Sequence, residues 1–421
     1  MLDFTILHVG DLHFDDLRAA SPDIDAKDAG ITRSLQTAIS GHPLQTVMKP
    51  MAEQADRADA ILFVGDLTSY GNHDIYVDAV KYLHTALALP DRVADRLHAV
   101  VGNHDVDRDL IYPGARTTDE LLAKFLPLTE AWTMHSVPIL APSEVRHSEI
   151  THGSVGIDLF SMNSCVACGE YRDRIFDQTL ETELSNLAAS GDRSARDTLF
   201  EQMDAPAFIA DHVSSVSATV RTMSAERVPV ILAHHNVLPQ FQPRLQIYAE
   251  MVNAGMARAQ LAGCGRPVIY LHGHIHDDPI EVVEQYHPNR GRLIAVSAPQ
   301  VARGFNVITI SFGQRDLPLG ATITPWRYAH GEVRAKTPVK VFLRRPDQEN
   351  HEATADILRV MAQARHTRYS NFIQLYRAEF GDARSEDELG EAIVEAEWAG
   401  LLTIDNLDED RQHWTIRSPL L

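Results

Sequence analysis

Short runs of apolar residues recur along this chain, and each run ends in a cluster of polar residues. The runs occupy residues 5–9, 60–64, 98–101, 228–232 and 267–271. Continuous apolar runs of this length predict strands that are buried on both faces. Helical periodicity lies between them, for example at residues 45–57 and 75–87. The alternation predicts a layered α/β domain in which helices cover a sheet.

The polar clusters follow the strands directly, which bears on where a ligand would bind. In layered α/β folds, ligands bind beyond the carboxyl ends of the strands. We expect the five strands to belong to one sheet, so that their ends direct side chains toward a common point. The sequence therefore predicts a single site to which all five clusters contribute.

The pattern changes near residue 335, where a basic, proline-containing stretch begins. Residues 352–364, 370–380 and 385–399 have helical periodicity, and residues 401–404 and 413–416 predict a hairpin. Three helices and a hairpin indicate a winged-helix-like domain, and a helical cap packed on the first domain is the alternative. We expect a catalytic domain at residues 1–335, a linker at 336–350 and this domain at 351–421.

The third predicted helix argues against nucleic-acid binding by the C-terminal domain. It lacks Lys and Arg, and its acidic residues are Glu386, Asp387, Glu388, Glu391, Glu395 and Glu397. A helix with this charge is repelled by the phosphates that flank a DNA groove. We therefore expect the C-terminal domain to bind a protein partner.

Composition narrows the class of protein further. The formal net charge is −20, which disfavours non-specific binding to polyanions. No apolar run of about 18 residues occurs, so no membrane association is expected. The chain runs directly into Asp3-Phe4-Thr5-Ile6-Leu7 without a basic region or a cleavage site, which indicates a cytoplasmic protein.

Cys165 and Cys168 form a C-x-x-C pair, a spacing found in redox centres and in half of a zinc site. The remaining cysteine, Cys264, is far away in sequence, so a four-ligand zinc site would have to recruit histidines. We interpret the pair as small residues in a loop that follows a strand at residues 157–162.

The polar clusters at the strand ends carry the residue types that bind divalent cations. In order, they are Asp11-Leu12-His13, Gly65-Asp66, Gly102-Asn103-His104-Asp105, His234-His235 and Gly273-His274-Ile275-His276. Alternation along an extended segment would place Asp11 and His13 on one side, and the Asp66 carboxylate can bridge two ions. A neutral Asn oxygen suits a site that already holds several carboxylates. These donors would be costly to bring together without a cation.

This order of motifs resembles the calcineurin-like metallophosphoesterase family over roughly residues 3–330. The resemblance implies a layered β-sandwich flanked by helices, with two divalent cations beyond the strand ends. It implies that the first ion is bound by Asp11, His13, Asp66 and His276, and the second by Asp66, Asn103, His234 and His274. It also implies that His104 stands beside the leaving-group oxygen as general acid or transition-state donor.

Two positions have alternatives within the sequence itself. Gly71-Asn72-His73-Asp74 repeats the four letters of the Asn103 motif, but Thr68-Ser69-Tyr70 precedes it instead of a strand. We interpret the repeat as a loop or the start of a helix. His234 is preferred over His235 as the ligand, because the family places the ligand on the first histidine after the strand.

The expected reaction is hydrolysis of a phosphodiester, in a nucleotide or a nucleic acid, by a hydroxide that bridges two cations about 3.5–4 Å apart. The motifs look like those of the family's cyclic-nucleotide phosphodiesterases and repair nucleases, with monoesterase activity as an alternative. The acidic chain favours a small nucleotide over a polymer. Mn²⁺ is the expected metal, with Fe, Zn²⁺ or Ni²⁺ as alternatives.

A second hypothesis concerns the assembly in which the chain works. The chain would be the nuclease or phosphatase effector subunit of a larger complex, and its C-terminal domain would dock it to a basic protein partner. A catalytically inactive scaffold is disfavoured by the complete set of ligands.

Overall fold

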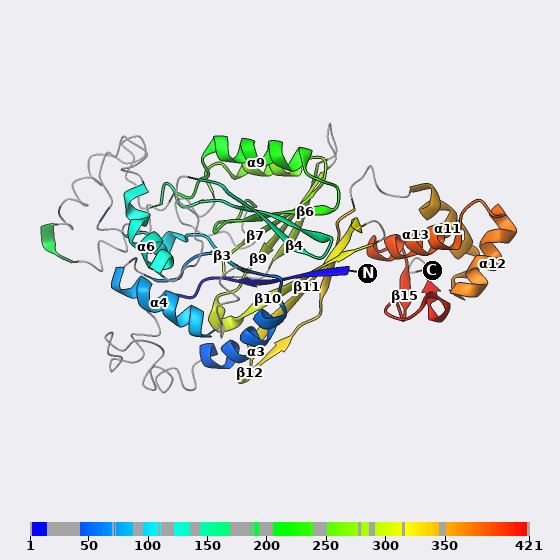
Figure 1. Ribbon diagram of the computed structural model, residues 1–421, viewed down its shortest axis with the longest axis horizontal. Helices are drawn as coiled ribbons and strands as arrows, with labels where there is room; N and C mark the ends of the chain where they lie inside the picture. Colours follow the sequence, from blue (N-terminus) through cyan, green and yellow to red (C-terminus); the bar gives the residue numbers. More distant parts are fainter. Residues whose placement is uncertain are drawn as a thin grey trace.

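The structure is a computed structural model, and its described residues cover most of the chain. They are residues 2–14, 43–69, 71, 73–86, 96–107, 110, 122–134, 144–168, 186, 189–192, 205–238, 251–276, 279–285, 291–313, 316–344 and 351–418. Figure 1 shows a layered body that holds the two larger sheets and, beside the start of the first strand, a small C-terminal unit drawn in orange and red.

Two mixed sheets form the centre of the larger body. The first has the order β12-β11-β10-β1-β2-β3 with β13 also paired to β11, and the second has the order β4-β5-β6-β7-β9-β8. The strands of the first sheet are β1 (Leu2–Val9), β2 (Ala60–Phe63), β3 (Leu97–Ala99), β10 (Gly304–Phe312), β11 (Pro318–Ala329), β12 (Glu332–Ala335) and β13 (Val339–Phe342). Those of the second are β4 (Arg146–His152), β5 (Val155–Ser161), β6 (Arg227–Leu232), β7 (Pro267–His272), β8 (Ile280–Gln285) and β9 (Gly291–Ser297).

The central core lies between the inner faces of the two sheets. Alternate residues of β1, such as Phe4 and Ile6, pack in one buried cluster with Ile157 of β5 and Val230 of β6. Apolar side chains on the inner faces of two packed sheets are removed from water together, which is the main stabilising term of a sandwich.

Helices cover the outer face of each sheet (Figure 1). One outer core packs β1 and β2 against α3 (Pro43–Arg57), α4 (His73–Ala86) and α6 (Leu126–Met134). The other packs β6 and β7 against α9 (Ala210–Thr222) and α10 (Ala254–Ala262). The apolar runs of the sequence are continuous because strands such as β1, β2, β6 and β7 contact apolar side chains on both faces. The predicted β-sandwich flanked by helices is confirmed.

One expectation is wrong: the five predicted strands do not belong to one sheet. β1, β2 and β3 lie in the first sheet, whereas β6 and β7 lie in the second. Within each sheet these neighbouring strands are parallel. Their polar ends still meet, because the two sheets are stacked with these carboxyl ends at the same edge.

The C-terminal unit contains the three predicted helices and the predicted hairpin. Its elements are α11 (His351–Ala364), β14 (His366–Arg368), α12 (Tyr369–Phe380), α13 (Glu386–Trp398), β15 (Thr403–Asp405) and β16 (Thr415–Arg417). β14 was not predicted, and it adds a third strand beside β16. Ser385 begins α13 with a capping box, in which its hydroxyl accepts from Glu388 N at 3.2 Å.

The unit packs on the larger body through α13. Trp398 covers Gly320 of β11, where a Cβ would lie only 2.2 Å from the indole ring. Lys340 Nζ of β13 is 2.8 Å from Glu397 Oε1. Buried Arg344 lies 3.6 Å from carboxylate oxygens of both Glu391 and Glu395. The unit packs on the first domain, as the cap alternative expects, and its likeness to a winged helix stays a prediction.

Part of the segment predicted as a linker belongs to the sheet. Residues 339–342 form β13, which pairs with β11 in antiparallel register. Apolar Val341 and Leu343 explain this, since they are buried in the core between the sheets. Within the part of the chain that the structure describes, no helix is long and apolar enough to cross a membrane.

Candidate metal centre

Five loops meet at one edge of the sandwich, and each begins where a strand ends. They follow β1, β2 and β3 in the first sheet and β6 and β7 in the second. Backbone hydrogen bonds join them in pairs. Asp11 N donates to Gly65 O at 3.1 Å, and Gly273 N donates to His234 O at 3.0 Å. The seven predicted ligands are therefore held by loops that are fixed to one another.

Asp11, His13, Asp66 and His276 form a first group. One potential ligand atom from each residue lies within 4.8 Å of the others. The two imidazole Nε2 atoms are 3.3 Å apart. His276 Nε2 is 3.8 Å from Asp11 Oδ1, and His13 Nε2 is 3.9 Å from Asp66 Oδ2. These are the four side chains predicted for the first ion.

Asn103, His234 and His274 form a second group around the amide oxygen. Oδ1 of Asn103 is 3.0 Å from His234 Nε2 and 3.1 Å from His274 Nδ1. Oδ2 of Asp66 is 3.2 Å from the same His234 Nε2. Asp66 thus reaches both groups, which is the position that a bridging carboxylate requires.

The structure distinguishes the two adjacent histidines after β6. His234 donates from Nδ1 to the carbonyl oxygen of Val64 at 2.7 Å, which leaves Nε2 directed at the second group. A backbone carbonyl that holds the other ring nitrogen is the usual support of a metal-binding histidine. His235 Nδ1 instead faces Ser164 Oγ at 3.0 Å. One potential ligand atom from each of His234, His235 and His274 lies within 4.8 Å of the others, so the choice of His234 stays a prediction.

The described part of the repeated motif lies in a different element from Asn103. Asn103 begins a 3₁₀ turn after β3, and its side chain is buried. In the repeat, His73 is the first residue of α4, which agrees with the interpretation as a helix start. Asn72 lies outside the described residues.

Several of the predicted ligands have an unusual backbone conformation. The φ angles are +48° at Asp11, +47° at His13, +54° at Asp66, +68° at His274 and +55° at His276. The extended segment expected at Asp11 and His13 is therefore wrong. Left-handed residues other than glycine are strained, and they persist where the surrounding structure holds them for a function. Tight reversals after the strands bring both side chains of each pair to the same site.

A comparison with protein families matches the calcineurin-like phosphoesterase model to residues 4–278. The chain belongs to the calcineurin-like phosphoesterase family. The matched segment contains all five loops.

Solved structures related to this phosphoesterase are distant in sequence. A putative 5'-nucleotidase from Staphylococcus aureus has 9% identity and a TM-score of 0.37, covering 81% of this chain and 54% of its own. The NAD nucleotidase of Haemophilus influenzae has 13% identity and a TM-score of 0.37, with 93% and 61% covered. The calcineurin-like phosphoesterase YfkN from Bacillus subtilis has 11% identity and a TM-score of 0.33, with 89% and 99% covered.

This phosphoesterase thus spans between about half and three-fifths of the length of the two nucleotidases. A comparison with curated proteins returned no match.

The charges of the phosphoesterase site fit a pair of cations. Burial raises the pKa of the Asp11 carboxyl well above its usual range. Burial acts in the same direction on Asp66, but contact with His234 holds the pKa of Asp66 well below that range. Burial opposes a charge on His234, yet Asp66 and Asp11 raise its pKa to about 9. A proton on His234 therefore supplies positive charge that divalent cations would supply when bound, and the carboxylate, amide and imidazole donors suit such ions.

His13 and His276 are prepared to act as ligands in a different way. Burial lowers the pKa of each to about 4, so both imidazoles are neutral at pH 7. Metal binding requires the neutral ring, and these two side chains therefore lose no proton when an ion binds.

Asp105 is a site residue that the sequence analysis did not assign. Its carboxylate accepts from Gly102 N at 2.9 Å and from Thr68 N at 3.1 Å, so it joins the Asn103 loop to the Asp66 loop. Asp105 is buried, and its two hydrogen bonds hold in place the loops that carry Asp66 and Asn103. The available signal was its place as the fourth letter of the motif, directly after Asn103 and His104.

Two glycines allow these loops to approach each other. A Cβ on Gly102 would lie 2.0 Å from Asp66 Oδ1, and a Cβ on Gly65 would lie 2.5 Å from Gly102 N. Gly65 also has a φ of +98°, which other residues rarely adopt. Both positions require glycine if Asp66 is to reach the two groups.

His104 lies beside the first group without being part of it. Its ring centroid is 5.1 Å from that of His13, and its Nδ1 donates to the carbonyl oxygen of Ser69 at 3.1 Å. Its backbone N–H donates to Asp66 Oδ1 at 2.9 Å. The ring is thus oriented by the protein, and its Nε2 is the nitrogen left for a substrate.

Proposed function

We propose that this phosphoesterase hydrolyses phosphodiesters of nucleotides, using two divalent cations. The proposed metal ligands are the seven side chains Asp11, His13, Asp66, Asn103, His234, His274 and His276. The observation that carries this proposal is the position of Asp66, which lies 3.9 Å from His13 Nε2 in one group and 3.2 Å from His234 Nε2 in the other. A single buried carboxylate between two sets of donors is the arrangement that a dinuclear site needs.

Each part of this chain then has a definite task. Asp11 and His276 complete the first position, and Asn103 and His274 complete the second. When bound, two cations would polarise the phosphoryl group, provide a nucleophile from water near neutral pH and stabilise the developing negative charge. The residues themselves would hold the two ions in place, because most of these side chains are buried and their loops are joined by backbone hydrogen bonds.

His104 is proposed as the general acid. The hydrogen bond from Nδ1 to Ser69 O fixes the ring plane. Nε2 would then donate a proton to the leaving-group oxygen of the ester. Hydrolysis of a diester releases an alkoxide, which must gain a proton. An oriented histidine beside the ions can supply that proton.

Two features support a small nucleotide diester as the substrate class. The net charge of −20 repels long polyanions, and a small substrate presents fewer charges to that field. The seven proposed ligands are carboxylate, amide and imidazole groups without a thiolate, which suits Mn²⁺ as well as Fe, Zn²⁺ or Ni²⁺. Mn²⁺ is the proposed metal.

The proposal is tested by comparing a diester with a monoester on the metal-loaded protein. Bis(p-nitrophenyl) phosphate and p-nitrophenyl phosphate would be assayed with and without Mn²⁺, followed by cyclic nucleotides and single- and double-stranded DNA. We expect Mn²⁺-dependent hydrolysis of the diester and of cyclic nucleotides. A clear preference for the monoester would overturn the diester assignment, and efficient cleavage of DNA would overturn the preference for small substrates.

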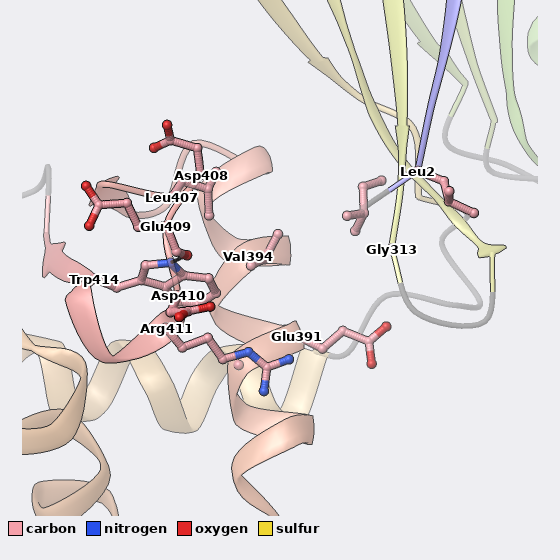
Figure 2. Close-up of a pocket in the computed structure, with 12 residues that line it drawn as sticks. Leu2, Gly313, Glu391, Val394, Leu407, Asp408, Glu409, Asp410, Arg411 and Trp414 are labelled. Atoms are coloured by element: carbon pink, nitrogen blue, oxygen red, sulfur yellow. Dashed lines mark hydrogen bonds between the residues drawn. The ribbon is translucent and has the colours of Figure 1, made fainter.

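A second candidate function, docking to a protein partner, is favoured by a cleft between the two units (Figure 2). The cleft has a volume of about 570 Å³. Leu2 and Leu319 lie on the sandwich side, and Val394, Leu407 and Trp414 lie on the C-terminal side. Four acidic residues line the cleft, namely Glu391, Asp408, Glu409 and Asp410, and one basic residue, Arg411, lines it with them.

We propose that this cleft binds a basic segment of a partner protein that also carries an apolar anchor. The excess of carboxylates complements Lys or Arg, and the apolar wall removes an aliphatic or aromatic side chain from water. The cleft lies apart from the metal centre, so docking and catalysis would use different residues of the same chain.

The docking hypothesis is tested on the full chain with a labelled lysine-rich peptide that contains a tryptophan, and with an acidic peptide that has the same apolar residues. We expect only the basic peptide to bind, more weakly at high salt and in Asp408→Lys. Glu53→Lys, an exposed acid-to-base change on α3, is the matched control and should bind as the wild type does. Equal binding of both peptides, or none, would contradict the hypothesis.

A further inference from the structure

The C-x-x-C pair of the sequence is not an isolated pair of small residues. Cys165 and Cys168 lie in a turn after β5, closed by a hydrogen bond from Cys168 N to Cys165 O at 2.9 Å. His235, which follows β6, packs against this turn. The exposed fractions are 0% for both cysteines and 1% for His235. The structure thus supplies the histidine that a zinc site at this pair would have to recruit.

The three side chains are spaced as ligands of one ion. One potential ligand atom from each lies within 4.8 Å of the others. Cys165 Sγ is 3.8 Å from His235 Nδ1. Zn–S bonds of about 2.3 Å and Zn–N bonds of about 2.0–2.1 Å place sulfur and nitrogen about 3.6 Å apart in a tetrahedral site. The observed distance therefore needs only a small adjustment.

Both cysteines belong to a buried apolar core, and polar groups lie beside them at two points. Ser164 Oγ lies 3.0 Å from His235 Nδ1, so a further oxygen is present at the same place. Lys124 is buried behind the turn and donates from Nζ to Val166 O at 2.9 Å and to Cys168 O at 2.8 Å. Burial raises the pKa of the Cys165 thiol well above its usual range, so an ion that binds here must displace the thiol proton.

We propose that Cys165, Cys168 and His235 form a sulfur-containing zinc site, distinct from the carboxylate, amide and imidazole donors of the catalytic centre. Because His235 follows His234 directly, an ion here would stabilise the loop that presents His234. Redox exchange is a poorer use of this pair, since thiols that are fully removed from solvent are inert toward dissolved oxidants. This proposal does not depend on the diesterase assignment.

Cobalt substitution tests the site without reference to catalysis. The full-length protein would be stripped with a chelator and titrated with Co²⁺, and thiolate-to-cobalt charge-transfer absorption would be recorded in the near ultraviolet. We expect this absorption in the wild type and its loss in Cys165→Ser and Cys168→Ser. Cys264→Ser is the matched control, because this third cysteine packs against Ser217 in a different core, and the absorption should persist there.

Two further measurements distinguish this site from the catalytic one. Asn103→Ala should retain the charge-transfer absorption while it loses catalytic metal. If the cysteine variants fail to fold, X-ray absorption at the zinc edge of the wild type replaces them, with sulfur scattering expected at about 2.3 Å. The proposal is overturned if wild-type protein with bound Co²⁺ shows no charge-transfer absorption, if the absorption survives Cys165→Ser, or if only nitrogen and oxygen surround the zinc.

Discussion

Oδ1 of Asn103 lies 3.0 Å from Nε2 of His234, although 131 positions separate the two residues in sequence. Asn103 follows a strand of the first sheet and His234 follows a strand of the second. The contact therefore spans the two halves of the sandwich, and the proposed second metal position exists only when both sheets are packed.

Asn103→Ala should abolish turnover and lower the metal content, because it removes the oxygen around which His234 and His274 are arranged. The measurement is hydrolysis of the activated diester together with metal analysis of the purified protein. Asn72→Ala is the matched control, since it changes the same residue type in the repeated motif, and it should alter neither quantity. Normal activity of Asn103→Ala would refute the ligand assignment.

His104→Ala should retain its metals but lose rate by roughly 10²–10⁴-fold, the usual contribution of a positioned acid. The loss should be largest for diesters with a poor leaving group, because p-nitrophenolate departs without a proton. Steady-state rates on both kinds of ester, with metal content measured in parallel, provide the check. A variant that loses its metals would show that His104 is a ligand instead.

Asp105→Ala should weaken metal binding or activity by roughly 10- to 100-fold, the range found for residues that orient metal ligands. The change leaves the N–H groups of Gly102 and Thr68 without their acceptor, so both loops lose their connection. Asp105→Asn retains one acceptor oxygen and should restore part of the metal affinity. If the two variants bind metal equally well and as tightly as wild type, Asp105 has no positioning role.

Arg344→Ala should lower the free energy of unfolding by about 3 kcal/mol or more, because it removes one partner of a buried ion pair. Arg344 is 2% exposed and faces Glu391 and Glu395 on α13. Arg377→Ala removes an ion pair whose side chain is 49% exposed and should have little effect. Denaturant unfolding measures both, and equal losses would show that the contact between the units is not held by Arg344.

His98 should make the protein less stable in acid. Burial, together with nearby Arg146, lowers the pKa of His98 from 6.5 to about 4. Above pH 6.5 the ring is neutral in both states, but below it the unfolded chain binds a proton that the folded chain refuses. Stability is therefore lost as the pH falls from 6.5 toward 4, by about 2 kcal/mol at pH 5 for this residue.

The comparison for His98 is His98→Leu, which removes the titrating ring. The difference in unfolding free energy between wild type and variant should change by about 2 kcal/mol between pH 8 and pH 5. The measurement at pH 8 is the internal reference, because the ring carries no charge there in either state. A constant difference between the two pH values would contradict the prediction.

Local sequence determined the elements and the chemistry of the donors. The apolar run at residues 60–64 became a strand with its last residues buried on both faces, and Asp66 followed it at the sheet edge. The three C-terminal helices and their hairpin were likewise predicted, because periodicity depends on neighbours within a few positions. The type of ligand in each loop is also a property of the sequence alone.

Tertiary structure decided how those parts meet. The division of the five strands between two sheets, the contact between Asn103 and His234, and the packing of His235 against Cys165 all join residues far apart in the chain. Arg344 and the acidic side of α13 are a further case, since a charge pattern suited to a free surface is used to hold two units together. Periodicity records which face of an element is buried but not which element covers it, and that choice is made by the packing of whole sheets and helices.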